Sequence, residues 1–186
     1  MRIFLSSALI LFASVWMGGA VPASADTPVT YTDEGRALFR FVVPDFWVLR
    51  TGGAREIEDT KLGDPRAVAR VMGMRPVTDE TVWMGFVSPA GVASIQDGVR
   101  YLRDIDKFLV KEPTIASTSD TRIGGLPARV FRGTGRREGR NVNFTATIID
   151  LPRNRVAIAV AILLDGADPA YADDLNAVFA SFRSVQ

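Results

Sequence analysis

Two adjacent apolar segments near the C-terminus constrain the fold more than any other part of the chain. Residues 142–150 alternate between apolar and polar side chains, which is typical of an antiparallel strand buried on one face. Residues 156–164 are apolar on both faces, which predicts a central strand covered on at least part of each side. Residues 151–155 would join the two strands. The chain must therefore build a sheet with other elements packed on both faces.

Several shorter segments also have the composition and alternation of strands. They are expected over residues 38–43, 46–50, 67–75, 81–88, 114–123 and 128–132, with 67–75 and 81–88 forming an antiparallel pair. Residues 26–34 are polar and contain Pro28, which predicts a loose lead-in. Residues 51–66 contain little apolar material and are expected to form a loop.

Two segments have the apolar spacing of a helix. The first contains a single apolar stripe made of Ile95, Val99, Leu102, Ile105, Phe108 and Leu109. Ser94 and Asp97 resemble a capping box at its start, and Pro113 is expected to end the segment. In the second, Asp168 is expected to cap the helix and Pro169 to occupy its first position. Its apolar stripe consists of Ala172, Leu175, Phe179 and Phe182.

Strands interrupted by two helices, with short connections, predict an α+β fold: a largely antiparallel sheet flanked by helices. The 186 residues less the first 25 leave 161. A chain of this size buries about 70% of its unfolded surface, which is enough for a stable core. We therefore expect a single domain over residues 26–186, with Ile158 and Phe179 buried in the same core.

The first 25 residues resemble a secretory signal peptide. Arg2 supplies a positive charge, residues 3–17 are apolar, and Ala23-Ser24-Ala25 provides small residues for cleavage. An uncleaved anchor over residues 3–21 is the alternative, since that stretch is about as long as a membrane-spanning helix. Gly18, Gly19 and Pro22 favour cleavage. The expected product is a soluble bacterial protein, periplasmic or secreted, that begins at Asp26 and keeps no stable membrane anchor.

Charge and composition exclude several classes of function. Arg2 is the one basic residue of the signal segment, so removing it from the 22 Lys and Arg leaves 21, equal to the 21 Asp and Glu. This balance gives no support for binding nucleic acid, which usually needs a basic excess. The chain contains no His and no Cys. It therefore cannot build a Ser-His-Asp or Cys-His catalytic site, a His- or Cys-ligated metal centre, or a disulfide.

No motif indicates a metal or a cofactor. Four acidic residues near the second helix lack the Asp-x-Asp-x-Asp-Gly spacing of a calcium loop: Asp165, Asp168, Asp173 and Asp174. Residues 133–135 form an isolated G-x-G that lacks the Lys-Ser/Thr of a phosphate-binding loop. We expect neither a metal site nor a cofactor. A pair of carboxylates for glycoside hydrolysis stays open, because any two acidic residues can converge in space.

One cluster of basic residues marks a candidate binding site. It consists of Arg132, Arg136, Arg137 and Arg140, with Glu138 among them, and most of it lies in an expected loop over residues 133–141. One interpretation is a solvated hairpin tip whose charges keep it soluble. The other is a recognition loop for a partner bearing carboxylates or phosphates, which the planar guanidinium fork suits.

Several short motifs resemble those of the Mog/PsbP-like family of α/β/α sandwiches. They are Tyr31-Thr32-Asp33-Glu34-Gly35, Phe39-x-Phe41-x-Val43-Pro44-Asp45-Phe46-Trp47, Gly124-Gly125-Leu126-Pro127-Ala128 and Phe179-Ala180-Ser181-Phe182-Arg183. The resemblance implies a fold more than a function. Members of that family include a photosystem II extrinsic subunit, a nuclear-transport partner of a small GTPase, and bacterial secretion chaperones. They mostly bind other proteins, and no catalytic set carries over.

Three hypotheses about function follow. The first is an exported, non-enzymatic accessory protein that binds another protein or an envelope component. The second is a carrier of a small ligand or lipid, with a pocket between the sheet and the helix at 95–109. A cavity lined by Met72, Met74, Met84 and Phe86 would favour the carrier, whereas a solid core there would favour the accessory protein. The third is a hydrolase that works without His.

Overall fold

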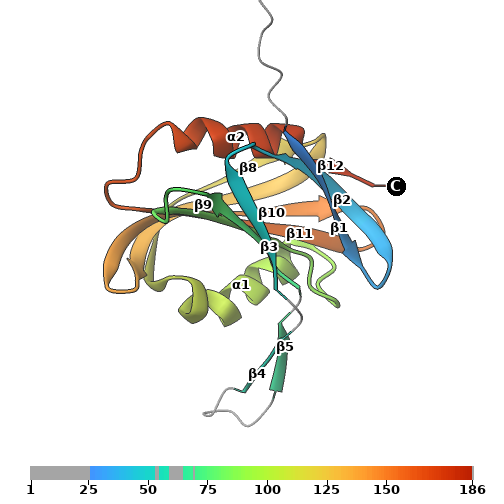
Figure 1. The fold of residues 1–186 in the computed structure, drawn as a ribbon. Coiled ribbons are helices and arrows are strands. Elements are labelled where there is room, and N and C mark those ends of the chain that lie inside the picture. Colours follow the sequence, from blue (N-terminus) through green and yellow to red (C-terminus); the bar gives the residue numbers. More distant parts are fainter. Residues whose placement is uncertain (1–25, 53–54, 59–64, 69, 186) are drawn as a thin grey trace, which may run out of the picture.

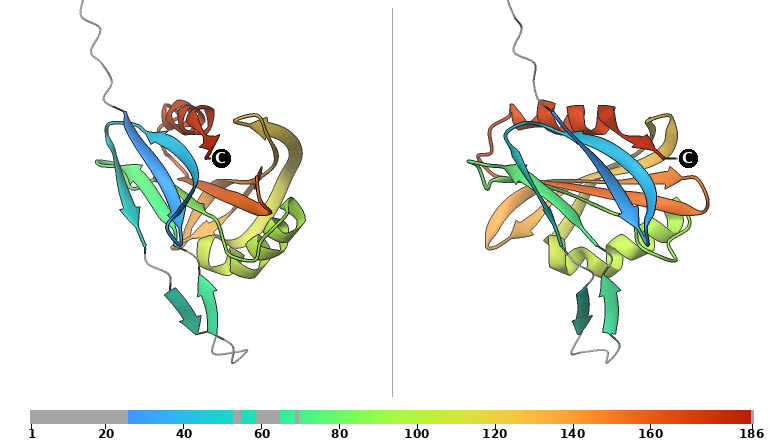
Figure 2. Two further views of the ribbon diagram at one scale, coloured as in Figure 1. Left: turned by 90° about the vertical axis from the view of Figure 1, so that its right-hand side faces the viewer. Right: turned by 45° about the vertical axis from the view of Figure 1, so that its right-hand side comes forward.

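The computed structural model describes residues 26–52, 55–58, 65–68 and 70–185, and these build three layers. The middle layer is a seven-stranded antiparallel sheet in the order β3-β6-β7-β11-β10-β9-β8. Helix α1 (Ile95–Leu109) covers one face. Helix α2 (Tyr171–Ser181) and a small sheet, β1-β2-β12, cover the other (Figures 1 and 2). The predicted α+β class is confirmed, and so is its largely antiparallel sheet flanked by helices.

The strands of the small sheet are β1 (Thr27–Asp33), β2 (Arg36–Val43) and β12 (Arg183–Ser184). Those of the large sheet are β3 (Trp47–Thr51), β6 (Met72–Pro76), β7 (Val82–Val87), β8 (Lys111–Ile123), β9 (Leu126–Arg137), β10 (Arg140–Leu151) and β11 (Arg155–Leu164). A separate hairpin of β4 (Arg55–Glu58) and β5 (Pro65–Val68) projects from the body of the domain (Figure 1).

The β10–β11 hairpin forms the centre of the large sheet, as the sequence predicts. Its ladder runs without a register shift from Val142 opposite Leu164 to Leu151 opposite Arg155. Arg153 and Asn154 make the turn with positive φ angles of 64° and 54°. Strand β7 pairs with the far side of β11, so β11 is hydrogen-bonded along both edges and buried on both faces.

The two faces of this hairpin belong to two separate cores. On one face, aliphatic side chains of β10 and β11 pack beneath α1. On the other, Ala157, Ala159 and Ala161 lie beneath α2 and the small sheet. Because successive strand residues point to opposite faces, Ile158 belongs to the α1 core, whereas Phe179 borders the α2 core and is only partly buried. The expectation that these two residues share one core is wrong.

The core beneath α2 is dominated by aromatic rings. Phe39 lies between Tyr31 and Phe182, with ring centroids 4.7 Å and 5.1 Å away. Phe41 stacks on Phe86 with centroids 4.4 Å apart. These contacts join the small sheet, the large sheet and the end of α2, and such ring pairs add about 0.5 to 1.5 kcal/mol beyond the area they bury.

A partly buried polar cluster ties the small sheet to the turn of the central hairpin. Nη2 of Arg155 donates to Oδ2 of Asp33 and to the carbonyl oxygen of Ser88, both at 2.8 Å. The hydroxyl of Tyr31 accepts from the backbone N–H of Ser88 at 3.2 Å and donates to the carbonyl oxygen of Arg70 at 2.8 Å. Burial is the largest cause of the raised pKa of Tyr31, so its hydroxyl stays protonated and able to donate.

Both predicted helices form, but their ends differ from the expectation. At α1, Oγ of Ser94 accepts from the N–H of Asp97 at 3.1 Å and donates to the carboxylate of Asp97 at 2.8 Å. The helix ends at Leu109, and Pro113 lies inside β8. Proline is tolerated there because β8 is an edge strand. Regular helix in α2 starts only at Tyr171, although Oδ1 of Asp168 accepts from the N–H of Ala170 at 2.9 Å.

Two expected irregular segments contain strands. Residues 27–33 of the predicted lead-in form β1, in which Tyr31 is 1% exposed. Few other side chains of β1 face the core, so the segment lacks the alternation of apolar and polar residues by which a strand is predicted from sequence. The predicted loop over 51–66 contains β4, and the predicted strand over 67–75 is divided between β5 and β6. Residues 53–54 and 59–64 of that loop lie outside the described residues.

The edge strand β8 has little cover. Of its thirteen residues only Ile123 is partly buried, and the register with β9 shifts twice near its start, between Lys111 and Thr114 and between Ile115 and Ser117. Strand β8 is one of the two edge strands of the large sheet, with β3 at the other edge, and the sheet curls at the β8 end (Figure 2). Its polar sequence fits an edge position.

We expect Phe182→Ala to lower the free energy of unfolding by about 3 to 5 kcal/mol, the range for removing a buried aromatic side chain. Phe182 is fully buried and contacts the rings of Phe39 and Phe86, whereas Phe179 is partly exposed. Phe179→Ala is the matched control and should cost clearly less. Urea unfolding of both variants checks this, and equal losses would contradict the assignment of the two rings.

Candidate functional site

The four predicted site arginines lie on a β-hairpin and not in a loop. Strand β9 continues to Arg137, the turn consists of Glu138 and Gly139 with positive φ angles of 51° and 80°, and β10 begins at Arg140. The predicted loop over 133–141 is therefore wrong. Its glycines meet a packing requirement, since a Cβ at Gly133 would collide with the carbonyl oxygen of Thr114.

Three of these arginines are exposed and reach solvent. Arg132 and Arg136 extend from the face of β9 that α2 covers further along, and Arg140 starts β10. Nη2 of Arg136 donates to the carbonyl oxygen of Gly139 at 3.0 Å, which leaves the remaining donors of its fork for other contacts. We call Arg132, Arg136 and Arg140 the hairpin arginines.

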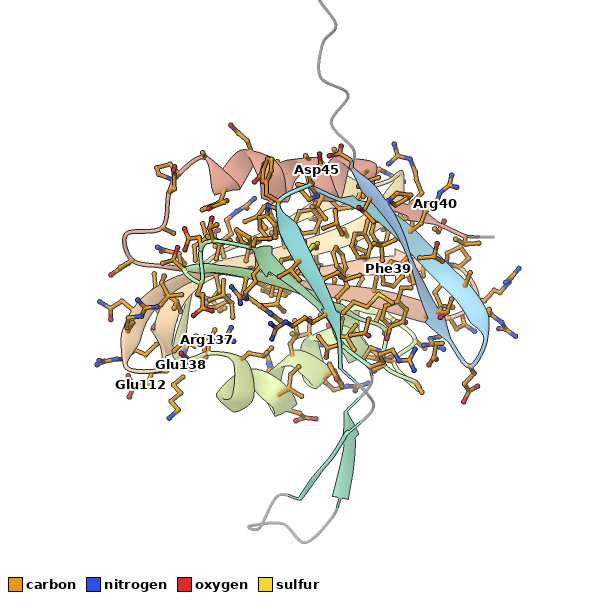
Figure 3. The ribbon with its side chains drawn as sticks, in the orientation of Figure 1. Phe39, Arg40, Asp45, Glu112, Arg137 and Glu138 are labelled. Carbon is orange, nitrogen blue, oxygen red and sulfur yellow. The ribbon has the colours of Figure 1, made fainter. Side chains whose placement is uncertain are left out.

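Acidic residues also lie at this tip. Figure 3 shows Glu138 beside Arg137, with Glu112 of β8 near them. The pairing of Lys111 with Arg136 explains how the start of β8 reaches the tip of the β9–β10 hairpin. The tip therefore has mixed charge with a basic excess. The local sequence shows Glu138 among the arginines, but it does not show Glu112, which comes from another strand.

Arg137 differs from the hairpin arginines because it packs against the body of the domain. Its guanidinium carbon lies 5.3 Å from the centre of the Trp83 ring. The indole itself lies on Gly73 and Gly85, which are cross-strand partners, and a Cβ at Gly85 would collide with the ring. Nη1 of Arg137 is buried and has no hydrogen-bond partner within the described residues. Arg137 therefore anchors the hairpin to the α1 face of the sheet.

An apolar pocket lies between α1 and the strands β8 to β11; we call it the α1 pocket. Its volume is about 230 Å³. It is lined by Val99, Leu102, Arg103, Leu109, Val110, Pro113, Ile115, Phe131, Phe144, Ala146 and Val160. Among the side chains that the structure describes, Arg103 is the one charged residue of this lining, and Ile115 is 51% exposed. The pocket thus has apolar walls and a single cation.

A second, smaller pocket of about 80 Å³ lies on the other flank of α1. Leu109 and Val160 line both pockets, so their side chains separate the two spaces. Tyr101 lines the smaller pocket, and its buried hydroxyl has no hydrogen-bond partner among the described residues. Burial raises the pKa of Tyr101, which keeps this hydroxyl protonated.

The α1 pocket lies where the carrier hypothesis places it, between the sheet and the helix at 95–109, but its walls differ from those expected. The side chains of Met72, Met74, Met84 and Phe86 belong to the buried aromatic core on the opposite face. By the criterion set from the sequence, that solid core favours an accessory protein. The cavity beneath α1 supports a ligand site on independent grounds.

Two of the four acidic residues near α2, Asp168 and Asp174, have local structural roles. Oδ2 of Asp174 accepts from Nε1 of Trp47 at 3.0 Å, and Asp168 accepts from the backbone of Ala170. In the part of the chain that the structure describes, no three acidic residues are grouped so that they could hold a metal ion. Over the same residues, no helix has the length and apolar character needed to cross a membrane.

Comparison with known proteins identifies the fold. No protein-family model matches the sequence, and no curated protein matches it. The solution structure of cyanobacterial PsbP (CyanoP) from Synechocystis sp. PCC 6803 matches with a TM-score of 0.53 and 12% identity, covering 90% of this chain and 96% of that chain. The crystal structure of LpqN, involved in cell envelope biogenesis of Mycobacterium tuberculosis, matches with a TM-score of 0.51 and 17% identity, covering 87% and 91%. The fold is PsbP-like, which confirms the predicted resemblance at the level of structure.

We expect Arg137→Ala to lower the free energy of unfolding by about 1 kcal/mol, because it removes a partly desolvated cation–π contact with Trp83. Arg136→Ala should change it by less than about 0.5 kcal/mol, as is usual at exposed positions. Chemical unfolding of the two variants checks this. If Arg137→Ala were as mild as its neighbour, the stacking on Trp83 would contribute nothing to stability.

Proposed function

We propose that this protein is an exported, non-enzymatic accessory protein that binds an acidic surface of another protein or envelope component through the hairpin arginines. The observation that carries the proposal is their arrangement. Arg132, Arg136 and Arg140 are exposed on one hairpin, while Arg137 fixes that hairpin to the sheet through Trp83. A rigid strand pair presents guanidinium groups with less loss of conformational freedom on binding than a mobile loop would.

The structural neighbours are compatible with such a role. One is a PsbP protein, and the other is involved in cell envelope biogenesis. The chain also lacks the His and Cys on which many hydrolytic and metal sites depend. These observations support binding over catalysis.

The α1 pocket favours a second candidate function, that of a carrier for a small ligand or lipid. Its apolar lining and its volume of about 230 Å³ are those of a small binding pocket. The two candidates use different parts of the molecule, since none of the hairpin arginines lines this pocket. A protein that binds both a partner and a ligand would combine them.

Export predicts a defined N-terminus. The apolar segment and the Ala23-Ser24-Ala25 site should direct cleavage after Ala25, so the mature chain should begin at Asp26, next to the start of β1 at Thr27. Intact mass and N-terminal sequencing of protein recovered from the periplasm or the medium provide the measurement. Recovery from the membrane fraction with Met1 in place would show that the segment is retained as an anchor.

Binding through the hairpin arginines predicts a loss of association rate on their removal. The partner is recovered with the mature protein as bait, and its binding is then measured at low and high salt. Replacing Arg132, Arg136 and Arg140 together by Ser should slow association and reduce the salt dependence of binding, because charge steering acts mainly on the rate of encounter. Stability should stay within about 0.5 kcal/mol of the wild type.

A matched control removes the same number of charges elsewhere. Arg36, Arg40 and Arg50 are exposed and lie on β2 and β3, so their joint replacement by Ser should leave association with the partner unchanged. Equal slowing in both triple variants would show that net charge alone acts. If the association rate and its salt dependence are unchanged in the hairpin variant, the hairpin arginines do not bind the partner and only keep the hairpin tip solvated.

A further inference from the structure

We propose that the α1 pocket binds a free fatty carboxylate, with the acyl chain inside the pocket and the carboxylate paired with Arg103 at its edge. The inference specifies the ligand class of the carrier candidate and rests on that candidate. It depends on none of the hairpin arginines, because none of them lines the pocket. Its failure would therefore leave the proposed partner binding untouched.

The volume and walls of the pocket fit an apolar chain. Cavities of about 150 Å³ lined by aliphatic and aromatic groups stay dry and take up molecules such as benzene. The α1 pocket is larger, at about 230 Å³, and ten of the eleven described residues that line it are apolar. They come from α1, from the link after it and from four strands, among them Phe131 of β9 and Phe144 of β10. Water inside would lack hydrogen-bond partners, so an acyl chain would replace it favourably.

The charge at the pocket indicates the head group. Arg103 is the one ionisable residue among the described side chains of the lining. It is exposed, so its guanidinium can remain hydrated while contacting a ligand at the edge. A guanidinium fork binds a carboxylate with two parallel hydrogen bonds, which a hydroxyl head group cannot match. The combination of an apolar interior and a single cation therefore selects an amphiphilic anion.

The pocket favours a free molecule over a membrane surface. Anionic membranes are recognised through clusters of basic residues. Within the described side chains, the lining of the α1 pocket contains one such residue, Arg103, and Asp104 follows it directly on α1. A single guanidinium matches one carboxylate, so we assign the site to individual fatty carboxylates.

The partition beneath α1 sets the length of chain that fits. Leu109 and Val160 divide the α1 pocket from the smaller space of about 80 Å³ on the other flank of the helix. A chain that fills the first space meets these two side chains. Shortening Leu109 would join the two spaces and should admit a longer chain, a change of selectivity that no purely structural role of Leu109 produces.

The test is calorimetric titration of the exported protein with octanoate, dodecanoate and hexadecanoate below their aggregation concentrations, with dodecanol as the uncharged probe. We expect saturable binding of one carboxylate per chain. Arg103→Ser should weaken dodecanoate binding by about tenfold, the effect of losing one charge-assisted contact, with little change for dodecanol. Arg103→Lys should recover part of the loss.

Two further variants act on the pocket itself. Ala146→Leu fills it from the sheet side and should abolish binding of all three carboxylates, while Leu109→Ala should move the preference toward the longest. Arg100→Ser is the matched control, because Arg100 lies one turn earlier on α1, bonds to Asp97 and does not line the pocket. Thermal unfolding establishes which variants are folded.

Absence of saturable binding to the folded wild type at every chain length would overturn the proposal. So would dodecanoate affinity that is equal in wild type, Arg103→Ser and Leu109→Ala. If Ala146→Leu fails to fold, the Arg103 and Leu109 variants decide the question without it. An equal loss in Arg100→Ser and Arg103→Ser would also contradict the site, because it would trace the effect to the charge of the helix and not to the pocket.

Discussion

The whole fold depends on the burial of β11 from both sides. A strand that carries large aliphatic side chains on one face and alanines on the other needs two covering layers, and each layer must match the size of the face it meets. The alanine face leaves room for bulky rings, and the α2 core supplies them from Phe39, Phe86 and Phe182. The aliphatic face meets α1, whose side chains fill the space less completely and leave the α1 pocket. The two faces of β11 thus explain both the solid core on one side of the sheet and the cavity on the other.

Much of this architecture can be read from the chain because its signals are local. The apolar period of 142–164 predicts the central hairpin, and the stripe on 95–109 predicts α1. Elements fail to be predicted where the signal comes from distant residues. Strand β1 forms a local hairpin with β2, but its one fully buried side chain, Tyr31, is held by Arg70 and Ser88, which lie far along the chain. The glycines of β9 resemble loop residues until the close approach of β8 is known.

The candidate site divides in the same way. Sequence identifies the arginines as a group but cannot separate Arg137 from the other three. Arg132 and Arg136 take the opposite face of β9 from Arg137, whereas Arg140 is the cross-strand partner of Arg137 on β10. The contact with Trp83, from a strand far away in sequence, is what distinguishes Arg137 from Arg140. Once the segment is recognised as a strand, the numbers alone place residues 132 and 136 on one face and residue 137 on the other. The α1 pocket has no such signal. Its lining is assembled from α1 and four strands, so it appears only when the layers are in place.

The exposed edge strand β8 has a consequence for behaviour at high concentration. A long strand with one open edge is a template on which copies of a protein can pair edge to edge and extend the sheet. In β8, Pro113 removes a donor and two register shifts distort the first half of the edge, while Ser, Thr and Asp occupy the second half. These features oppose polymerisation without covering the strand. The protein can therefore remain unaggregated although its largest sheet ends in an exposed edge strand.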